Sequence, residues 1–246
     1  MYKLVLALAL SSAAAFTPSS QRGARVAPAK ASTFGNAPND PLNGWVADSS
    51  AFAYGLPGSL DPVPAFDPFD FVSGKSVDEI KMLREAEVTH GRVAMLATVG
   101  FIAQERAHFL FVEPDKDIGP AIRHLDEVRA VNPAFFELLT FTIGCCELYR
   151  ALNGWIAPTS TEAGKVTLEL PDGALRALRP DYYPGDVGFD PLNLKPTGAE
   201  EFAEMATKEL QHGRLAMLAS AGFLAQELVN EQPIWANLVA QAKPDL

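Results

Sequence analysis

The sequence predicts an all-α membrane protein in which three helices cross the bilayer and a short amphipathic C-terminal helix follows the third. The first observation is a nineteen-residue segment that occurs twice, as EVTHGRVAMLATVGFIAQE (87–105) and ELQHGRLAMLASAGFLAQE (209–227), with thirteen identical positions. The second is an apolar stretch of 24 residues between Pro133 and Pro158, enough to cross a hydrocarbon core of about 30 Å. The duplication relates the first and third helices by an internal two-fold repeat, so we expect those two helices to cross.

The start of the chain predicts two targeting segments. Residues 1–15 hold one lysine, a short apolar core and a small-residue end, which is typical of a signal peptide. Residues 16–32 are rich in Ser and Ala and basic, which is typical of a plastid transit segment. A plain secretory signal is the alternative. The remaining domain, 33–246, holds all 30 acidic residues of the chain, which argues against a nucleic-acid partner because phosphates would repel it.

Within this domain, the repeat and the apolar stretch give the positions of the membrane helices. We expect them at about 80–106, 134–156 and 200–229. The repeat helices have no charged residue at 93–103 or at 215–225, and their flanks extend each one to a spanning length. The tripeptide Phe-Asp-Pro precedes both of them, at 66–68 and at 189–191. The duplication therefore includes the loop that leads into each helix.

The other segments give weaker signals. Residues 113–133 are polar and are expected to form a loop. Residues 233–242 place apolar side chains on one face, which suits either an amphipathic helix at a membrane interface or an ordinary capping helix. Cys145 and Cys146 are adjacent within the apolar stretch, so we expect small core residues and not a disulfide. His108 and His124 stand in loop-like surroundings and are expected at the surface.

Each repeat places a glutamate and an arginine at one end of an otherwise apolar helix. The arginine comes five residues after the glutamate, roughly 140° further round the helix, so the two do not readily pair. In a two-fold packing, however, Glu87 can reach Arg214 and Glu209 can reach Arg92. Because an unpaired charge in hydrocarbon costs about 2.5–3.5 kcal/mol, we expect both exchanged pairs. Each repeat helix also carries a stripe of small residues that allows a close helix crossing. The two stripes are Gly91, Ala94 and Thr98, and Gly213, Ala216 and Ser220.

Each glutamate is also followed, three residues later, by a histidine on the same helix face, His90 or His212. A charge-compensated carboxylate and a neutral imidazole both suit magnesium as single axial donors, whereas haem iron more often takes His or Met on both faces. About 26 Å further along each helix lie Gln104 and Gln226, whose amide oxygens can also act as donors. A lone histidine in a membrane is more often structural, but the same Glu, His and Gln recur in register.

The motif ExxHGRxAM occurs twice, each copy is preceded by Phe-Asp-Pro, and PGDVGFDPLNLKP stands before the third helix. In these features the chain resembles the chlorophyll-binding light-harvesting superfamily, and its presequence points to the fucoxanthin chlorophyll a/c branch. The resemblance covers nearly all of residues 33–246. It implies chlorophyll a, chlorophyll c and fucoxanthin or related xanthophylls as cofactors. It also implies a multi-pass protein of the plastid thylakoid membrane, oligomeric, with other antenna subunits, a photosystem core and thylakoid lipids as partners.

The resemblance also implies roles for single residues. Ligands of chlorophyll magnesium would be Glu87, His90, Glu209, His212 and Gln226, with Arg92 and Arg214 as counter-charges. Gln104 follows as a ligand from the repeat. Glu147 matches the glutamate of the middle helix only loosely, and a structural ion pair is the alternative. Carotenoid contacts would be Phe66, Asp67, Pro68, Met95, Phe189, Asp190, Pro191 and Met217. The family's green members often have a further histidine ligand in the C-terminal helix, and this chain has none after His212.

The expected function is light harvesting with transfer of excitation to a photosystem. The sequence contains no nucleophile-base pair or phosphate loop, so we expect no enzyme. The motifs REAEVTHGRVAM and TKELQHGRLAM are similar to those of stress-related relatives that dissipate excess excitation, so photoprotective quenching is an alternative. An alternative of another class is a haem-binding electron-transfer bundle that uses His90 and His212. That alternative leaves the Glu/Arg exchange and both glutamines unexplained.

Overall fold

The computed structural model describes residues 42–106, 119–156, 159–161, 165–167 and 177–242. The targeting segments expected at 1–15 and 16–32, and His108, lie outside them. The elements in chain order are the 3-10 helix η1 (Phe52–Gly55), α2 (Val77–Arg106), the 3-10 helix η2 (Ala121–Arg123), α3 (His124–Val131), α4 (Ala134–Gly154), the strands β1 (Thr159–Thr161) and β2 (Lys165–Thr167), α5 (Ala199–Asn230) and α6 (Ile234–Ala242). The described chain is therefore predominantly helical, with one antiparallel hairpin that the sequence analysis did not expect.

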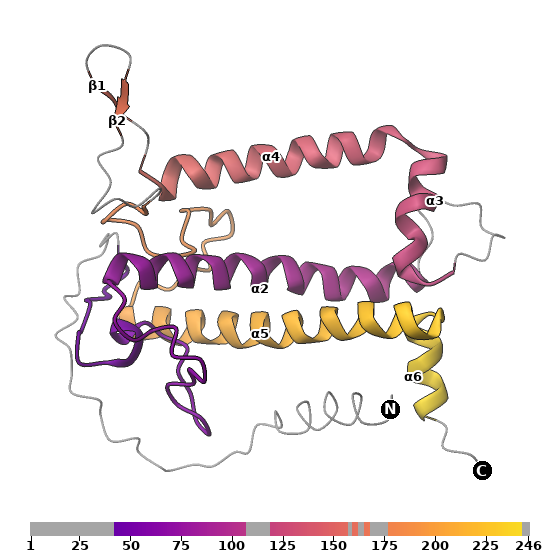
Figure 1. Ribbon diagram of the computed structural model, residues 1–246, viewed down its shortest axis with the longest axis horizontal. Helices are drawn as coiled ribbons and strands as arrows, with labels where there is room; N and C mark the ends of the chain where they lie inside the picture. The colour runs from indigo at the N-terminus through magenta and orange to yellow at the C-terminus, as the bar shows by residue number, and fades with distance from the viewer. Residues whose placement is uncertain (1–41, 107–118, 157–158, 162–164, 168–176, 243–246) are drawn as a thin grey trace.

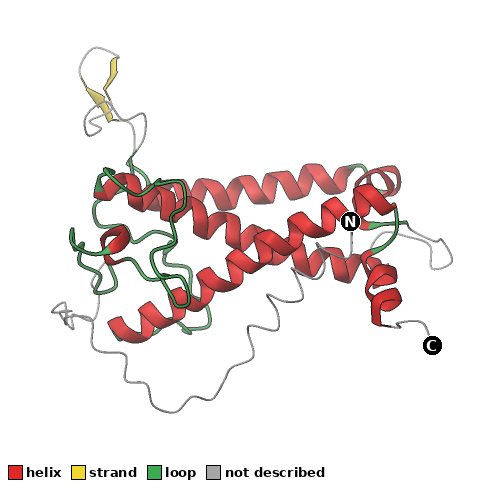
Figure 2. Ribbon diagram, turned by 60° about the horizontal axis from the view of Figure 1, so that its bottom comes forward, coloured by secondary structure: helices red, strands yellow, loops and turns green. Residues whose placement is uncertain are grey.

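The two repeat helices, α2 and α5, form the centre of the molecule. They run in the same direction side by side (Figure 1) and cross each other when the view is turned (Figure 2). The small-residue stripe is the reason they can approach: a β-carbon on Gly91 would come within 3.0 Å of the Cα of Gly213. Ala94 and Ala216 are buried one turn further on, and the hydroxyl of Thr98 donates across the interface to the carbonyl of Ala216 at 3.2 Å.

The middle helix α4 runs in the opposite direction along α2 (Figure 1). Its C-terminal end is packed: Gly154 is buried, and a β-carbon there would come within 2.9 Å of the ring of Tyr182. The expectation that Cys145 and Cys146 are core residues is wrong, because both are exposed. The helix touches the rest of the chain mainly near its ends, so side chains in its middle, including Phe141, stay uncovered.

A small aromatic core closes the end where α2 and α5 begin. Trp45, from the segment before η1, packs edge-on against Tyr183, and Tyr183 packs edge-on against Phe202 of α5. Ile80 of α2 is buried in the same cluster. This cluster joins the two approach loops to the first turns of both repeat helices.

The opposite end shows a second exchange between the repeats. The carboxylate of Glu227 in α5 accepts the backbone N–H groups of Ala121 and Ile122, which begin η2, at 3.0 and 2.9 Å. The equivalent carboxylate of Glu105 in α2 accepts the N–H groups at the start of α6, at 2.7 and 2.9 Å. Each carboxylate thus caps the short helix that follows the other repeat. Residues 113–133, expected as a loop, therefore include η2 and α3.

None of the helices within the described residues has both the length and the apolar character needed to cross a membrane.

Candidate functional site

The two exchanged ion pairs lie between about a third and half of the way along the crossing helices. Nε of Arg214 in α5 donates to Oε1 of Glu87 in α2 at 2.7 Å. Nε of Arg92 in α2 donates to Oε1 of Glu209 in α5, also at 2.7 Å. The exchange expected from the five-residue offset is therefore present. All four side chains are partly exposed, so each carboxylate is neutralised by its arginine without being enclosed by protein.

Each of these arginines is also held by a glycine that the sequence analysis missed. Arg214 donates from Nη1 to the carbonyl of Gly58 at 2.6 Å, and Arg92 donates in the same way to Gly185 at 2.7 Å. Both glycines have a positive φ, and a β-carbon on either would come within 2.8 Å of a side chain on a repeat helix. The available signal was a Pro-Gly pair that precedes Phe-Asp-Pro in both repeats. The approach loop of each repeat therefore positions the arginine of the other.

The two histidines have the same geometry in both repeats. Nδ1 of His90 lies 2.7 Å from the carbonyl of Ala86, and Nδ1 of His212 lies 2.8 Å from the carbonyl of Lys208. A carbonyl can only accept, so Nδ1 carries the proton and donates it in each case. The lone pair of Nε2 is then available to coordinate a metal ion, and both imidazoles are exposed. This arrangement fixes the tautomer and orientation of a metal-ligating histidine.

In the middle helix, Glu147 is paired with an arginine on its own helix. Nε and Nη2 of Arg150 donate to Oε2 of Glu147 at 2.9 and 2.6 Å, and Nη1 donates to Oε1 of Glu85 in α2 at 2.9 Å. The contacts of Arg150 with Glu147 involve only Oε2. Glu147 can therefore form a structural ion pair through Oε2 and still offer Oε1 to a metal ion. The interpretation as an ion pair and the interpretation as a ligand are compatible. The signal missed in the sequence was the Glu-x-x-Arg spacing inside an apolar helix.

Glu85 is the most enclosed carboxylate of this region, at 1% exposure. Besides Arg150 it accepts the hydroxyl of Tyr182 at 3.0 Å and the N–H of Gly185 at 2.6 Å. Burial and the charge of Glu85 both raise the pKa of Tyr182, so its hydroxyl stays protonated and donates. Glu85 thus joins α2, α4 and the loop before α5, and sequence reasoning did not identify it.

The two glutamines at the far end are not equivalent. Gln104 is exposed and its Oε1 lies 3.2 Å from Nδ1 of His124, whose Nε2 lies 3.2 Å from the carbonyl of Gly119. His124 is buried at 7% exposure, so the expectation of a surface histidine is wrong: it follows directly on η2, which packs against α2 and α5. Gln226 is half-buried on α5, and no hydrogen bond of its side chain is found within the described residues.

The two Phe-Asp-Pro loops adopt the same turn. The carboxylates of Asp67 and Asp190 each accept the backbone N–H groups of the residues four and five positions later, at 2.8 to 3.0 Å. These bonds lower the pKa of Asp190 below its usual range. Phe66 and Phe189 remain 71% and 77% exposed. Of the other residues expected to contact carotenoids, two are exposed, Pro68 and Pro191, and two are half-buried, Met95 and Met217.

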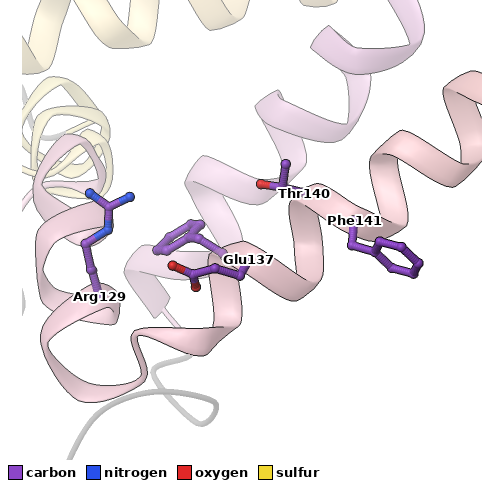
Figure 3. A pocket seen from close by; sticks show the side chains of 5 residues that line it. Arg129, Glu137, Thr140 and Phe141 are labelled. Atoms are coloured by element: carbon purple, nitrogen blue, oxygen red, sulfur yellow. The ribbon is translucent and has the colours of Figure 1, made fainter.

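A separate hollow of about 420 Å³ lies between α3 and α4 (Figure 3). The guanidinium of Arg129 lies 5.9 Å from the centre of the Phe136 ring, which is a cation–π distance. None of the residues singled out in the sequence lines this hollow. Its lining residues are Arg129, Phe136, Glu137, Thr140 and Phe141.

The side chains described above that could coordinate a metal ion are not clustered with one another. Within the described residues there is no cluster of three or more His, Cys, Asp or Glu that could hold a metal ion by itself. A magnesium ion bound to one such donor therefore needs its other ligands from elsewhere, as the planar ring of a chlorophyll provides. Single carboxylate, imidazole and amide donors fit this group.

Residues 52–228 match the family described as "Chlorophyll A-B binding protein". The chain belongs to this family. It is 48% identical over 185 residues to a fucoxanthin-chlorophyll a-c binding protein of Isochrysis galbana, covering 75% of this chain and 82% of that protein. It is 43% identical over 203 residues to the light-harvesting complex stress-related protein 1 of Chlamydomonas reinhardtii, covering 81% and 74%. With photosystem I chlorophyll a/b-binding protein 3-1 of Arabidopsis thaliana it shares 33% over 215 residues, covering 82% and 75%.

The resemblance drawn from the repeated motif is therefore confirmed. The family match covers η1, α2, α4 and almost all of α5, so both exchanged ion pairs and both histidines of this chlorophyll-binding family member lie inside it.

Proposed function

We propose that the chain is an antenna protein of the plastid thylakoid membrane that binds chlorophyll a, chlorophyll c and fucoxanthin or a related xanthophyll, and passes excitation to a photosystem. The observation that carries the proposal is the pair of exchanged ion pairs, each with an oriented imidazole one turn away. The family match and the 48% identity to a protein named for fucoxanthin and chlorophylls a and c support the choice of pigments.

Chlorophyll, once bound, supplies light absorption and excitation transfer, and the residues of the chain fix where each ring lies. Glu87 and Glu209 would donate a carboxylate oxygen to magnesium, with Arg214 and Arg92 as counter-charges. His90 and His212 would donate through Nε2. Further donors would be Gln226 and Glu147, and Gln104 is a weaker candidate because His124 already contacts its amide oxygen. The Phe-Asp-Pro loops, with Met95 and Met217, would contact the carotenoids.

The proposed arrangement in the membrane has three spanning helices, α2, α4 and α5, with α6 at an interface. The charges at the helix crossing support it because they are paired, which lowers the cost of burying them in hydrocarbon. The uncovered apolar side chains along α4, among them Leu138, Phe141 and Ile143, also support it. Such a surface suits lipid and pigment contacts, and in an oligomer it suits neighbouring antenna subunits and a photosystem core.

The test is to refold the chain with extracted chlorophylls and xanthophylls and purify the product. We expect bound chlorophyll and transfer of excitation from carotenoid and chlorophyll c to chlorophyll a, seen in the fluorescence excitation spectrum. The matched control is Glu87→Leu with Arg214→Leu, which removes one donor together with its counter-charge and should lose about one chlorophyll. A wild-type product without chlorophyll, or one that takes up haem instead, contradicts the proposal.

Photoprotective quenching is the second candidate function. The identities to stress-related relatives, 43% and 44%, are nearly as high as the 48% to the fucoxanthin-chlorophyll protein. The chlorophyll fluorescence lifetime of the isolated protein distinguishes the two. A lifetime that shortens between neutral pH and about pH 5 supports quenching, and an unchanged lifetime supports harvesting.

A further inference from the structure

One charge difference between the two repeats lies within ion-pair distance of a carboxylate. Arg84 stands three residues before Glu87, whereas the equivalent position before Glu209 is Ala206. Nε of Arg84 lies 3.3 Å from Oε2 of Glu87, and Oε1 of the same carboxylate accepts from Arg214. Both oxygens of Glu87 therefore face a guanidinium.

Glu209 has a simpler environment. Its Oε1 accepts from Arg92, and within the described residues no second cation lies at ion-pair distance. Two cations and one anion thus meet at the Glu87 site, and one cation and one anion meet at the Glu209 site. The duplicated motif hides this difference because the arginine stands outside the nineteen-residue repeat.

Arg84 is fixed in its place. Its side chain is only 10% exposed, and Nη1 donates to the carbonyl of Pro57 in the approach loop. A β-carbon on the next residue, Gly58, would come within 2.9 Å of Nη1, so the loop packs directly against the guanidinium. Because the guanidinium is enclosed in this way, its charge is screened less than a surface charge.

We propose that Arg84 is a positioning residue that makes the two carboxylate sites unequal: it lies beside the second oxygen of Glu87, which keeps a lone pair for magnesium, and places an uncompensated positive charge beside the pigment bound there. This inference rests on the proposed function. A fixed charge shifts the absorption of a nearby chromophore because its ground and excited states differ in charge distribution. The pigment on Glu87 therefore absorbs at a different energy from the pigment on Glu209, which gives excitation a preferred direction between the repeats.

The experiment first assigns the two absorption bands. Difference spectra between the wild type and two pair deletions, Glu87→Leu with Arg214→Leu and Glu209→Leu with Arg92→Leu, identify the band of each pigment in the reconstituted protein. If the wild type binds no chlorophyll, the proposed function fails. If each deletion removes one pigment, the proposed function stands, and the inference is tested separately by the variants that follow.

Arg84→Met should shift the Glu87 band toward the Glu209 band without loss of the other pigment, and Arg84→Lys should keep the wild-type band. Ala206→Arg, which adds a second cation beside Glu209, should shift the Glu209 band toward the Glu87 band, and it decides the matter if Arg84→Met does not refold. The inference is overturned if Arg84→Met and Ala206→Arg leave the bands in place. Loss of both pigments equally in Arg84→Met and Arg84→Lys, with no shift in Ala206→Arg, would show a structural role only.

Discussion

Replacing Arg92 by leucine removes two hydrogen bonds that join the repeats. Nε donates to Glu209 and Nη1 donates to the carbonyl of Gly185, both at 2.7 Å. The side chains of Arg92 and Glu209 are 41% and 36% exposed, so the cost is below that of breaking a fully buried pair. We expect the binding free energy of the pigment on Glu209 to weaken by about 1.5–3 kcal/mol, the range for a hydrogen bond to a charged group.

Because 1.4 kcal/mol corresponds to a tenfold change in an equilibrium constant, the pigment on Glu209 should bind roughly 10- to 150-fold more weakly. The pigment on Glu87 should stay bound. The assay is the chlorophyll-to-protein ratio after refolding with pigments at several pigment concentrations. Arg123→Leu is the matched control: it breaks the pair of Arg123 with Glu231, whose side chains are 58% and 73% exposed, and should lose no pigment. Loss of only the Glu87 pigment in Arg92→Leu would refute the exchanged pairing.

Three further predictions follow from single residues. His212→Leu should lose about one chlorophyll while the protein still folds, and an unchanged pigment stoichiometry would make the imidazole structural. Gly91→Ala should lower thermal stability by about 1–3 kcal/mol, seen as a lower melting temperature, because its β-carbon would come within 3.0 Å of the facing glycine of α5. Burial alone would raise the pKa of Asp186, but hydrogen bonds from Lys195 and Asn43 lower it below its usual range. Its contribution to stability is therefore present at neutral pH and lost as pH falls through the lowered pKa, and the corresponding acid destabilisation should be smaller in Asp186→Asn than in the wild type.

The helices of the repeats could be expected from the sequence because their signal is local and doubled. The five-residue offset between Glu87 and Arg92 is a property of helix geometry alone, so it excluded pairing within one helix and left pairing between the repeats. The stripe through Gly91 and Gly213 likewise required only helical spacing.

The remaining features depend on distant parts of the chain. Helix α3 has no side-chain cap of its own, and the preceding turn η2 is capped by Glu227, which is more than a hundred residues away in sequence. Glu85 looks like one more charge in an amphipathic turn until Arg150, Tyr182 and Gly185 converge on it. The inequality of the two glutamines was hidden for the same reason, since His124 comes from the region expected to be a loop.

In the proposed function, Glu87 and Glu209 each donate to magnesium while an arginine of the other repeat balances the charge. An experimental structure of the purified, pigment-loaded protein tests it most directly. We predict a chlorophyll magnesium within about 2.1 Å of one carboxylate oxygen of each glutamate, with Arg214 and Arg92 on the other oxygen and, at Glu87, Arg84 beside the oxygen that binds magnesium. Chlorophylls ligated by other residues, with both glutamates bonded only to arginine, would contradict it.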